Sequence, residues 1–347
     1  MRNFDLNRLV RENVKMLKPY SSARDDFKGN KNSMIFLDAN ENPFENGVNR
    51  YPDPQQKDLK SVLAKQRGVQ IENILLGNGS DEVLDLIYRA FCEPAQDNII
   101  TLPPTYGMYK VLAETNNINN REVLLTNDFQ PDVNEILKLA NQQTKLLFLC
   151  SPNNPTGNSF NDDKIESILN NFNGLVVIDE AYIDFSNQES WLSKLDKYPN
   201  LIITQTLSKA YGLAGIRLGI CYASKDIITV LNKIKPPYNV NELTQNRAVK
   251  RLLQPETIRK EISTILAEKN KLIKTLLEVN FVSKVYPSDA NFIMVEVDNA
   301  DKRCKEFIAK GFVIRNRSTQ PLCNNCIRIT IGTPDENNKL IATLKEI

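Results

Sequence analysis

Residues 175–209 read LVVIDEAYIDFSNQESWLSKLDKYPNLIITQTLSK and contain two short apolar runs, each followed by polar side chains. The runs Leu175–Ile178 and Leu201–Thr204 are rich in β-branched residues, which predicts buried strands. Asp179 follows the first run directly, and Lys209 follows the second after a short interval. Ligands in open parallel sheets bind beyond the carboxyl ends of the strands, so we expect these two side chains at one site.

The same alternation of apolar runs and helical patterns extends from about residue 70 to residue 235. Further strands are predicted at Ile74–Leu76, Asn98–Leu102, Lys145–Cys150 and Leu218–Tyr222. Helical patterns between the runs include Asp81–Phe91, Val133–Leu139 and Asp162–Asn170. Alternation of this kind predicts an α/β fold, with a mostly parallel sheet and helices on both faces.

The pattern changes after Pro236 and Pro237. A long helical stretch, about Thr244–Val279, is followed by predicted strands at Asn291–Val297, Phe312–Arg315 and Ile327–Ile331. Near the N-terminus, Leu6–Leu17 reads as one short amphipathic helix ended by Pro19. We therefore expect a large domain over residues 41–237 and a small α+β domain over residues 238–347. The N-terminal segment, residues 1–40, is expected to join the small domain.

Composition narrows the possible chemistry. The 347 residues include no histidine, which excludes Ser-His-Asp and Cys-His catalysis and leaves Lys, Tyr, Asp, Glu or Cys to move protons. The net charge of +2 gives no reason to expect nucleic acid or a membrane surface as a partner. Only Cys323 and Cys326 have C-x-x-C spacing, and without a second pair we expect no metal site. The predicted location is the cytoplasm.

Polar residues follow the other predicted strands as well. Gly77–Glu82 is a glycine turn that enters a helix, a common phosphate cradle. Tyr106 follows two prolines and could stack on a flat ring, and Arg217 lies beyond Lys209. Each feature alone has an ordinary structural explanation, such as a helix cap or a surface charge. Together they match the needs of pyridoxal phosphate, namely an amine, an anion for the ring nitrogen and positive groups around the phosphate.

The chain resembles the fold-type-I aminotransferases of the class I/II group from about Leu9 to its end. The runs that carry the resemblance are Leu75–Pro94, Pro103–Tyr109, Ser151–Gly157, Ile178–Tyr182 and Thr206–Gly219, the last of which reads TLSKAYGLAGIRLG. Further runs are similar to the branch that acts on L-histidinol phosphate: LKPYSSAR (17–24), LDANENPF (37–44), RYPDP (50–54), KPPYNV (235–240) and IRITIGT (327–333).

The resemblance implies that residues 41–237 bind pyridoxal phosphate. Lys209 would hold it as a Schiff base and move the reacting proton, and Asp179 would pair with the ring nitrogen. Tyr182 and Asn153 would contact the phenolic oxygen, and Tyr106 would stack on the ring. The implied phosphate ligands are Gly79, Ser80, Ser208, Arg217 and, from a partner subunit, Tyr51.

The resemblance also implies a substrate site. Its expected residues are Tyr20 from the other subunit, Asn40, Asn153, Arg315 and Arg328. Arg328 would take the carboxylate of the amino donor, and with Arg315 and Tyr20 it would meet the substrate phosphate. An arginine fork suits both anions. We expect Arg317, two residues beyond Arg315, to be a surface charge.

The implied reaction moves an amino group between L-histidinol phosphate and 2-oxoglutarate, giving imidazole-acetol phosphate and glutamate, in histidine biosynthesis. Because Tyr20 and Tyr51 would cross between sites, the resemblance implies a homodimer. Three alternatives remain open: a transaminase for aromatic amino acids, a threonine-phosphate decarboxylase, and a non-catalytic regulator that binds the cofactor.

Overall fold

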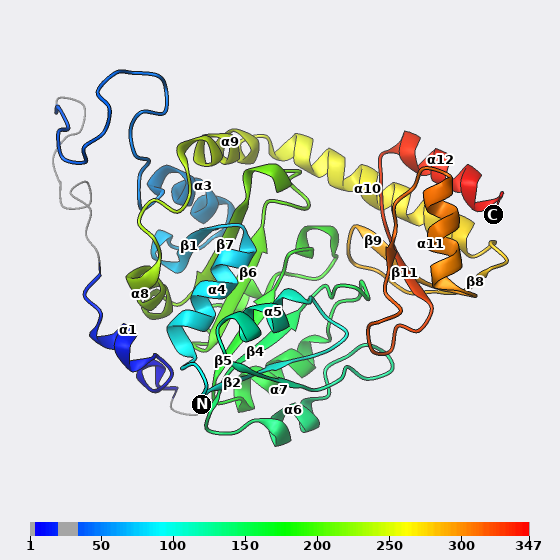
Figure 1. Cartoon of the computed structure of the whole chain (residues 1–347), viewed down its shortest axis with the longest axis horizontal. Helices are drawn as coiled ribbons and strands as arrows, with labels where there is room; N and C mark the ends of the chain where they lie inside the picture. The colour runs from blue at the N-terminus through cyan, green and yellow to red at the C-terminus, as the bar shows by residue number, and fades with distance from the viewer. Residues whose placement is uncertain (1–3, 20–33, 347) are drawn as a thin grey trace.

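The computed structural model describes residues 4–19 and 34–346. Its larger sheet has the strand order β1-β7-β6-β5-β4-β2-β3 (Figure 1). The strands are β1 (Ile74–Asn78), β2 (Asn98–Thr101), β3 (Asn119–Glu122), β4 (Thr144–Cys150), β5 (Leu175–Asp179), β6 (Leu201–Thr206) and β7 (Leu218–Ala223). Strand β7 runs antiparallel to β1 and β6, whereas the other pairings are parallel. The expected α/β fold with a mostly parallel sheet is confirmed.

Successive side chains of the strands enter two separate cores, as the pleat requires. Leu147 packs in the core on one face, and its neighbour Leu146 packs in the core on the other. The first face is covered by α3 (Lys57–Arg67), α6 (Val133–Leu139), α7 (Asp162–Asn171) and α9 (Glu242–Leu252). The second is covered by α1 (Glu12–Met16), α4 (Ser80–Phe91), α5 (Met108–Thr115) and α8 (Lys225–Ile234). Because both faces are buried, the strands read as continuous apolar runs.

The smaller sheet is antiparallel, with the order β10-β11-β9-β8. Its elements are β8 (Val282–Val285), β9 (Phe292–Val297), β10 (Arg315–Asn316) and β11 (Cys326–Thr330), with helices α10 (Pro255–Leu276), α11 (Ala300–Ala309) and α12 (Pro334–Leu344). These helices cover one face of the sheet with an apolar core that includes Leu272, Phe307 and Leu340. Helix α10 begins next to α9 and extends to the smaller sheet, so it links the parts of the chain that contain the larger and the smaller sheet (Figure 1).

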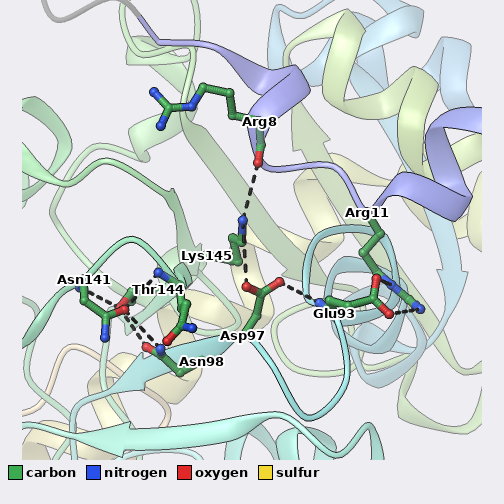
Figure 2. Close-up of polar contacts among 9 residues, drawn as sticks. Arg8, Arg11, Glu93, Asp97, Asn98, Asn141, Thr144 and Lys145 are labelled. Carbon is green, nitrogen blue, oxygen red and sulfur yellow. Dashed lines mark hydrogen bonds and ion pairs between the residues drawn. The ribbon is translucent and has the colours of Figure 1, made fainter.

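The described part of the N-terminal segment packs on the larger sheet, which differs from the expectation that residues 1–40 join the small domain. Leu9, Val10 and Val14 belong to the core beneath α4 and α8. Figure 2 shows the polar contacts that fix this segment at the amino ends of β2 and β4. Arg11 pairs with Glu93 at 3.1 Å, and Lys145 donates to the backbone oxygen of Arg8 at 3.4 Å. The N-terminal segment packs on the larger sheet because its apolar side chains enter this core and its charged and backbone groups bond to residues at the core's edge.

Two predicted helices are divided. Residues 6–17 form a short 3-10 helix, η1 (Leu6–Arg8), and α1, and the stretch 244–279 is interrupted before Pro255, which begins α10. Proline is favoured at the first position of a helix and disfavoured inside one. The other 3-10 helices of the described chain are η3 (Ile71–Asn73), η4 (Ile183–Phe185), η5 (Trp191–Lys194) and η6 (Ala214–Ile216). Over the described ranges, no helix is both long and apolar enough to cross a lipid bilayer.

Candidate active site

The candidate site lies between the carboxyl ends of the central strands and the face of the smaller sheet that α10, α11 and α12 leave uncovered. Tyr182, just beyond β5, connects the two layers. Its ring meets the ring of Phe292 edge to face, with centroids 5.1 Å apart. On the other side, Lys209 Nζ lies 5.9 Å from the centroid of the Tyr182 ring. Residues from β5, the loop after β6 and β9 therefore converge here.

Asp179 ends β5 as a buried carboxylate, only 3% exposed. The Tyr109 hydroxyl donates to its Oδ2 at 2.8 Å, and the Ala181 backbone N–H donates to Oδ1 at 3.2 Å. Burial raises the pKa of Asp179, against the hydrogen bonds that favour its anion. No ion pair holds it within the described part of the chain. A buried carboxylate without a cationic partner fits the protonated ring nitrogen of pyridoxal phosphate.

Lys209 lies within electrostatic range of this carboxylate and remains accessible to solvent on one side. Partial desolvation and then the charge of Arg328 lower the pKa of Lys209, and Asp179 acts in the opposite direction. A lower pKa leaves more of the amine neutral, and the neutral amine is the form that attacks an aldehyde. Lys209 is therefore suited to bind the cofactor's carbonyl carbon.

The start of α4 forms an anion cradle. Gly79 has φ +83° and precedes Ser80, the first residue of the helix. A Cβ at position 79 would lie 2.6 Å from Arg217 Nη2, so glycine lets this guanidinium approach the backbone closely. Arg217 is also 3.6 Å from Asp81, and the Ser208 hydroxyl accepts from the Thr206 hydroxyl at 3.0 Å. Helix-start amides beside an arginine fit a phosphate group.

The two neighbouring asparagines of the turn after β4 have different partners. Asn153 Nδ2 donates to the Pro104 oxygen at 2.9 Å and to the Thr156 hydroxyl at 2.8 Å, so it joins the turn to the loop after β2. Asn153 is fully buried. Asn154 Oδ1 instead accepts from Arg328 Nη1. The role implied for Asn153 remains a prediction, and Asn154 is a second candidate for a ligand contact because it bonds Arg328.

Tyr106 lies beside Asp81, with its hydroxyl 3.0 Å from the Asp81 carboxylate. Its ring meets the ring of Tyr109 edge to face at 5.5 Å. Both contacts fix Tyr106 between the anion cradle and the Asp179 carboxylate. This position is compatible with the predicted stacking on a ring, which remains a prediction.

Three arginines of the smaller sheet occupy the face that looks toward this region. Arg315 is paired with Arg328 across β10 and β11, and the Arg317 backbone N–H continues the ladder to the Cys326 oxygen at 2.8 Å. The Arg328 guanidinium lies 5.1 Å from the Phe292 ring. Arg317 is half-buried beside the other two, so the expectation that it is a surface charge is wrong.

The remaining predicted residues lie apart from this cluster. Asn40 is exposed, and Tyr51 stacks on Tyr238 with ring centroids 4.5 Å apart. Both belong to the segment before α3, which loops outward from the molecule (Figure 1). Tyr20 lies outside the described residues. Sequence reasoning also missed Tyr109 and Asp81, although a carboxylate in the first turn beside the glycine motif was a visible signal for Asp81.

Comparisons with known proteins identify the family of the chain. Residues 34–344 match the model of the family "Aminotransferase class I and II". The chain belongs to this aminotransferase family. It is 66% identical to the histidinol-phosphate aminotransferase of Flavobacterium johnsoniae, with 99% of each chain covered. It is 64% identical to that of Christiangramia forsetii, with 100% of this chain and 99% of the other covered.

Solved structures show the same fold. The histidinol-phosphate aminotransferase of Clostridium acetobutylicum superposes with a TM-score of 0.80 at 23% identity, covering 86% of this chain and 90% of that one. The enzyme of the same name from Sinorhizobium meliloti, in complex with pyridoxal-5'-phosphate, has a TM-score of 0.79 at 25% identity and covers 86% and 82%. The fold-type-I aminotransferase architecture is thereby confirmed.

Proposed function

We propose that this chain is a pyridoxal-phosphate-dependent transaminase that acts on L-histidinol phosphate and 2-oxoglutarate in histidine biosynthesis. The observation that carries the proposal is that Lys209 lies within electrostatic reach of the buried Asp179, of Arg217 at the Gly79 cradle and of Arg328 in the smaller sheet. The identity of 66% and 64% to relatives of that activity supports the substrate assignment.

When bound, pyridoxal phosphate supplies an aldehyde that receives the amino group and a ring that accepts the electrons of a broken C–H bond. Asp179 would keep the ring nitrogen protonated, because its carboxylate is buried and oriented by Tyr109 and the Ala181 amide. The start of α4, with Arg217 and Ser208, holds the phosphate. We assign the contact with the phenolic oxygen to Tyr182 and to Asn153, with Asn154 as a second candidate.

Lys209 has two tasks. Its Nζ would hold the cofactor when no substrate is bound, and once free it would accept the proton from the substrate Cα. The lowered pKa of Lys209 suits both tasks, since only the neutral amine accepts a proton. Arg328, oriented by Asn154, binds the carboxylate of glutamate or the phosphate of histidinol phosphate as the two substrates alternate.

The proposal includes a homodimer in the cytoplasm. The segment before α3 exposes large apolar side chains, namely Ile35 and Leu37 at 85% and Phe44 at 79%. Exposed apolar side chains on one continuous segment are typical of a protein interface. Tyr51 would then reach the phosphate cradle of the partner subunit.

The decisive experiment measures turnover of histidinol phosphate with 2-oxoglutarate by the purified, cofactor-loaded protein. We expect turnover and a visible absorption band that Lys209→Ala loses together with activity. Lys225→Ala, which changes a lysine at the start of α8 remote from the site, is the matched control and should keep both. Preference for phenylalanine or decarboxylation of threonine phosphate would replace the proposed substrate, and a band that persists in Lys209→Ala would refute the role of Lys209.

A further inference from the structure

The position of Arg317 is set by the ladder between β10 and β11. Its backbone pairs with Cys326, two residues before Arg328 on the same strand, just as Arg315 pairs with Arg328. Side chains two residues apart on a strand point to the same face. Ile327 and Ile329 fill the core under α10, α11 and α12, so the arginines project from the opposite face. That face is the one that carries Phe292 against Tyr182.

We define the arginine cluster as Arg315, Arg317 and Arg328, whose positive charges are not paired with carboxylates of the described chain. Within residues 4–19 and 34–346, no carboxylate forms an ion pair with any of the three. The Nε atoms of Arg317 and Arg328 are buried without a hydrogen-bond partner. Such donors are costly unless a ligand satisfies them.

The pKa of Arg317 responds to the charges of the other two arginines of the cluster. Burial, followed by the charges of Arg328 and Arg315, lowers the pKa of Arg317 to about 10. The charges of Arg328 and Arg317 both act on Tyr182, at the floor of the site. A half-buried guanidinium among like charges destabilises the fold by itself. Its position therefore indicates a binding site for an anion that neutralises it.

We propose that Arg317 is a substrate-specificity residue that binds the dianionic phosphate of histidinol phosphate. This inference rests on the proposed function. A carboxylate carries one negative charge, and Arg328 can bind it with both of its donors. A phosphate monoester carries nearly two charges and three acceptor oxygens, so it can use a second and a third guanidinium. Arg317 therefore favours the phosphorylated substrate over glutamate at the same position.

The test compares Arg317→Gln with wild type in the cofactor-loaded enzyme. Loss of one charge-assisted contact weakens binding by about 10- to 100-fold. We expect KM for histidinol phosphate to rise by that factor, KM for glutamate to change by less than about 3-fold, and kcat to stay within a few-fold. Arg317→Lys should recover part of the loss, because lysine restores the charge without the planar fork.

Thermal unfolding separates this role from a structural one. Removing a half-buried charge from a like-charged cluster relieves repulsion, so Arg317→Gln should have an equal or higher Tm than wild type. Inorganic phosphate should raise the Tm of wild type more than that of the variant. Arg259→Gln, which changes an exposed arginine on α10, is the matched control and should leave KM and the phosphate response unchanged.

The outcomes are distinct for the two proposals. Equal KM increases for histidinol phosphate and glutamate, or an unchanged KM for both, would overturn the assignment of Arg317. A lower Tm with an unaltered phosphate response would also overturn it. If wild type does not turn over histidinol phosphate, the proposed function fails, and the phosphate-dependent Tm shift still reports whether Arg317 binds the anion.

Discussion

Asp179 and Glu180 are consecutive buried carboxylates with different surroundings. Glu180 accepts hydrogen bonds from the Ser190 hydroxyl at 2.6 Å, the Trp191 backbone N–H at 2.7 Å and the Gln205 amide at 2.8 Å. Those donors belong to the protein and saturate the group. Asp179 faces the other side of the strand, where Tyr109 leaves part of its carboxylate for a ligand. We therefore infer that Glu180 is structural and that Asp179 is the carboxylate available to the cofactor.

The two carboxylates should respond oppositely to amide substitution. Asp179→Asn should lower kcat by about 100-fold or more, because it removes preorganised charge from the reacting ring, while the melting temperature of the cofactor-free protein stays the same or rises. Glu180→Gln should lower the melting temperature and leave kcat within a few-fold. Steady-state kinetics and thermal unfolding of both variants decide the matter, and the reverse pattern would contradict these assignments.

Lys60, on α3, has a pKa lowered by burial and by the charge of Lys235 to about 8, from 10.5. Between pH 8 and 10.5 the unfolded chain binds the proton and the folded chain does not, so the stability contributed by this group rises with pH in that window. Below pH 8 the charged lysine costs about 3 kcal/mol.

Lys60→Met keeps the volume and removes the charge. We expect a higher free energy of unfolding at pH 7, with the advantage over wild type shrinking as the pH rises to 10. Chemical denaturation at several pH values measures this difference. An advantage that does not change with pH would rule out titration of Lys60 as its source.

Residue types at the site were predictable, but some positions were not. Asp179 ends β5 and Lys209 comes three residues after the end of β6, so their edge of the sheet could be inferred from the chain. Whether Asn153 or Asn154 faces the ligand depends on the backbone of the turn, which a run of two asparagines leaves open. Arg317 was misjudged because its burial depends on β11, which begins nine residues later along the chain.

The start of α4 depends on a close approach between backbones. Strands β1 and β7 bring Gly77 opposite Gly219, and a Cβ on Gly219 would overlap the backbone of Gly79 and Ser80. The anion cradle is thus positioned by a glycine that lies far from it in sequence. Only glycine at position 219 lets β7 pass this close to the first residues of α4.

Gly219→Ala should displace the cradle. We expect a loss of about 1–3 kcal/mol in stability from overpacking, and weaker cofactor binding than in wild type. Equilibrium unfolding and titration with pyridoxal phosphate measure the two effects. Gly215→Ala, at a position where an added Cβ meets nothing within 4 Å, is the control and should change neither.

Strands buried on both faces were predicted well, and exposed strands were missed. The runs for β2, β4 and β5 are correct within a residue, and the helical pattern Val133–Leu139 coincides with α6. Strand β3 reads NNRE and gave no apolar signal, because it lies at the sheet edge and depends on pairing with β2. Strand β8 is likewise partly exposed, at the edge of the smaller sheet. Such strands are specified by their neighbours rather than by their own composition.

If two chains share their sites, two inactive variants should complement each other. Lys209→Ala and Tyr51→Ala each disable a different half of the shared site. A mixed dimer contains one site with both native residues, so co-expression should restore about a quarter of wild-type activity. Activity of the separate and co-expressed variants, with dimer mass by light scattering, provides the measurement. Mixed dimers without recovery would show that Tyr51 acts within its own chain or not at all.

Helix α10 has 22 residues and is continuous from its proline start beside α9 to the smaller sheet. Its length is about 33 Å, and a tilt of about 5° at the proline end moves the far end by about 3 Å. That displacement equals the length of a hydrogen bond. Because α10 is continuous, we expect side chains around Pro255 to influence the position of the arginine cluster without contacting it.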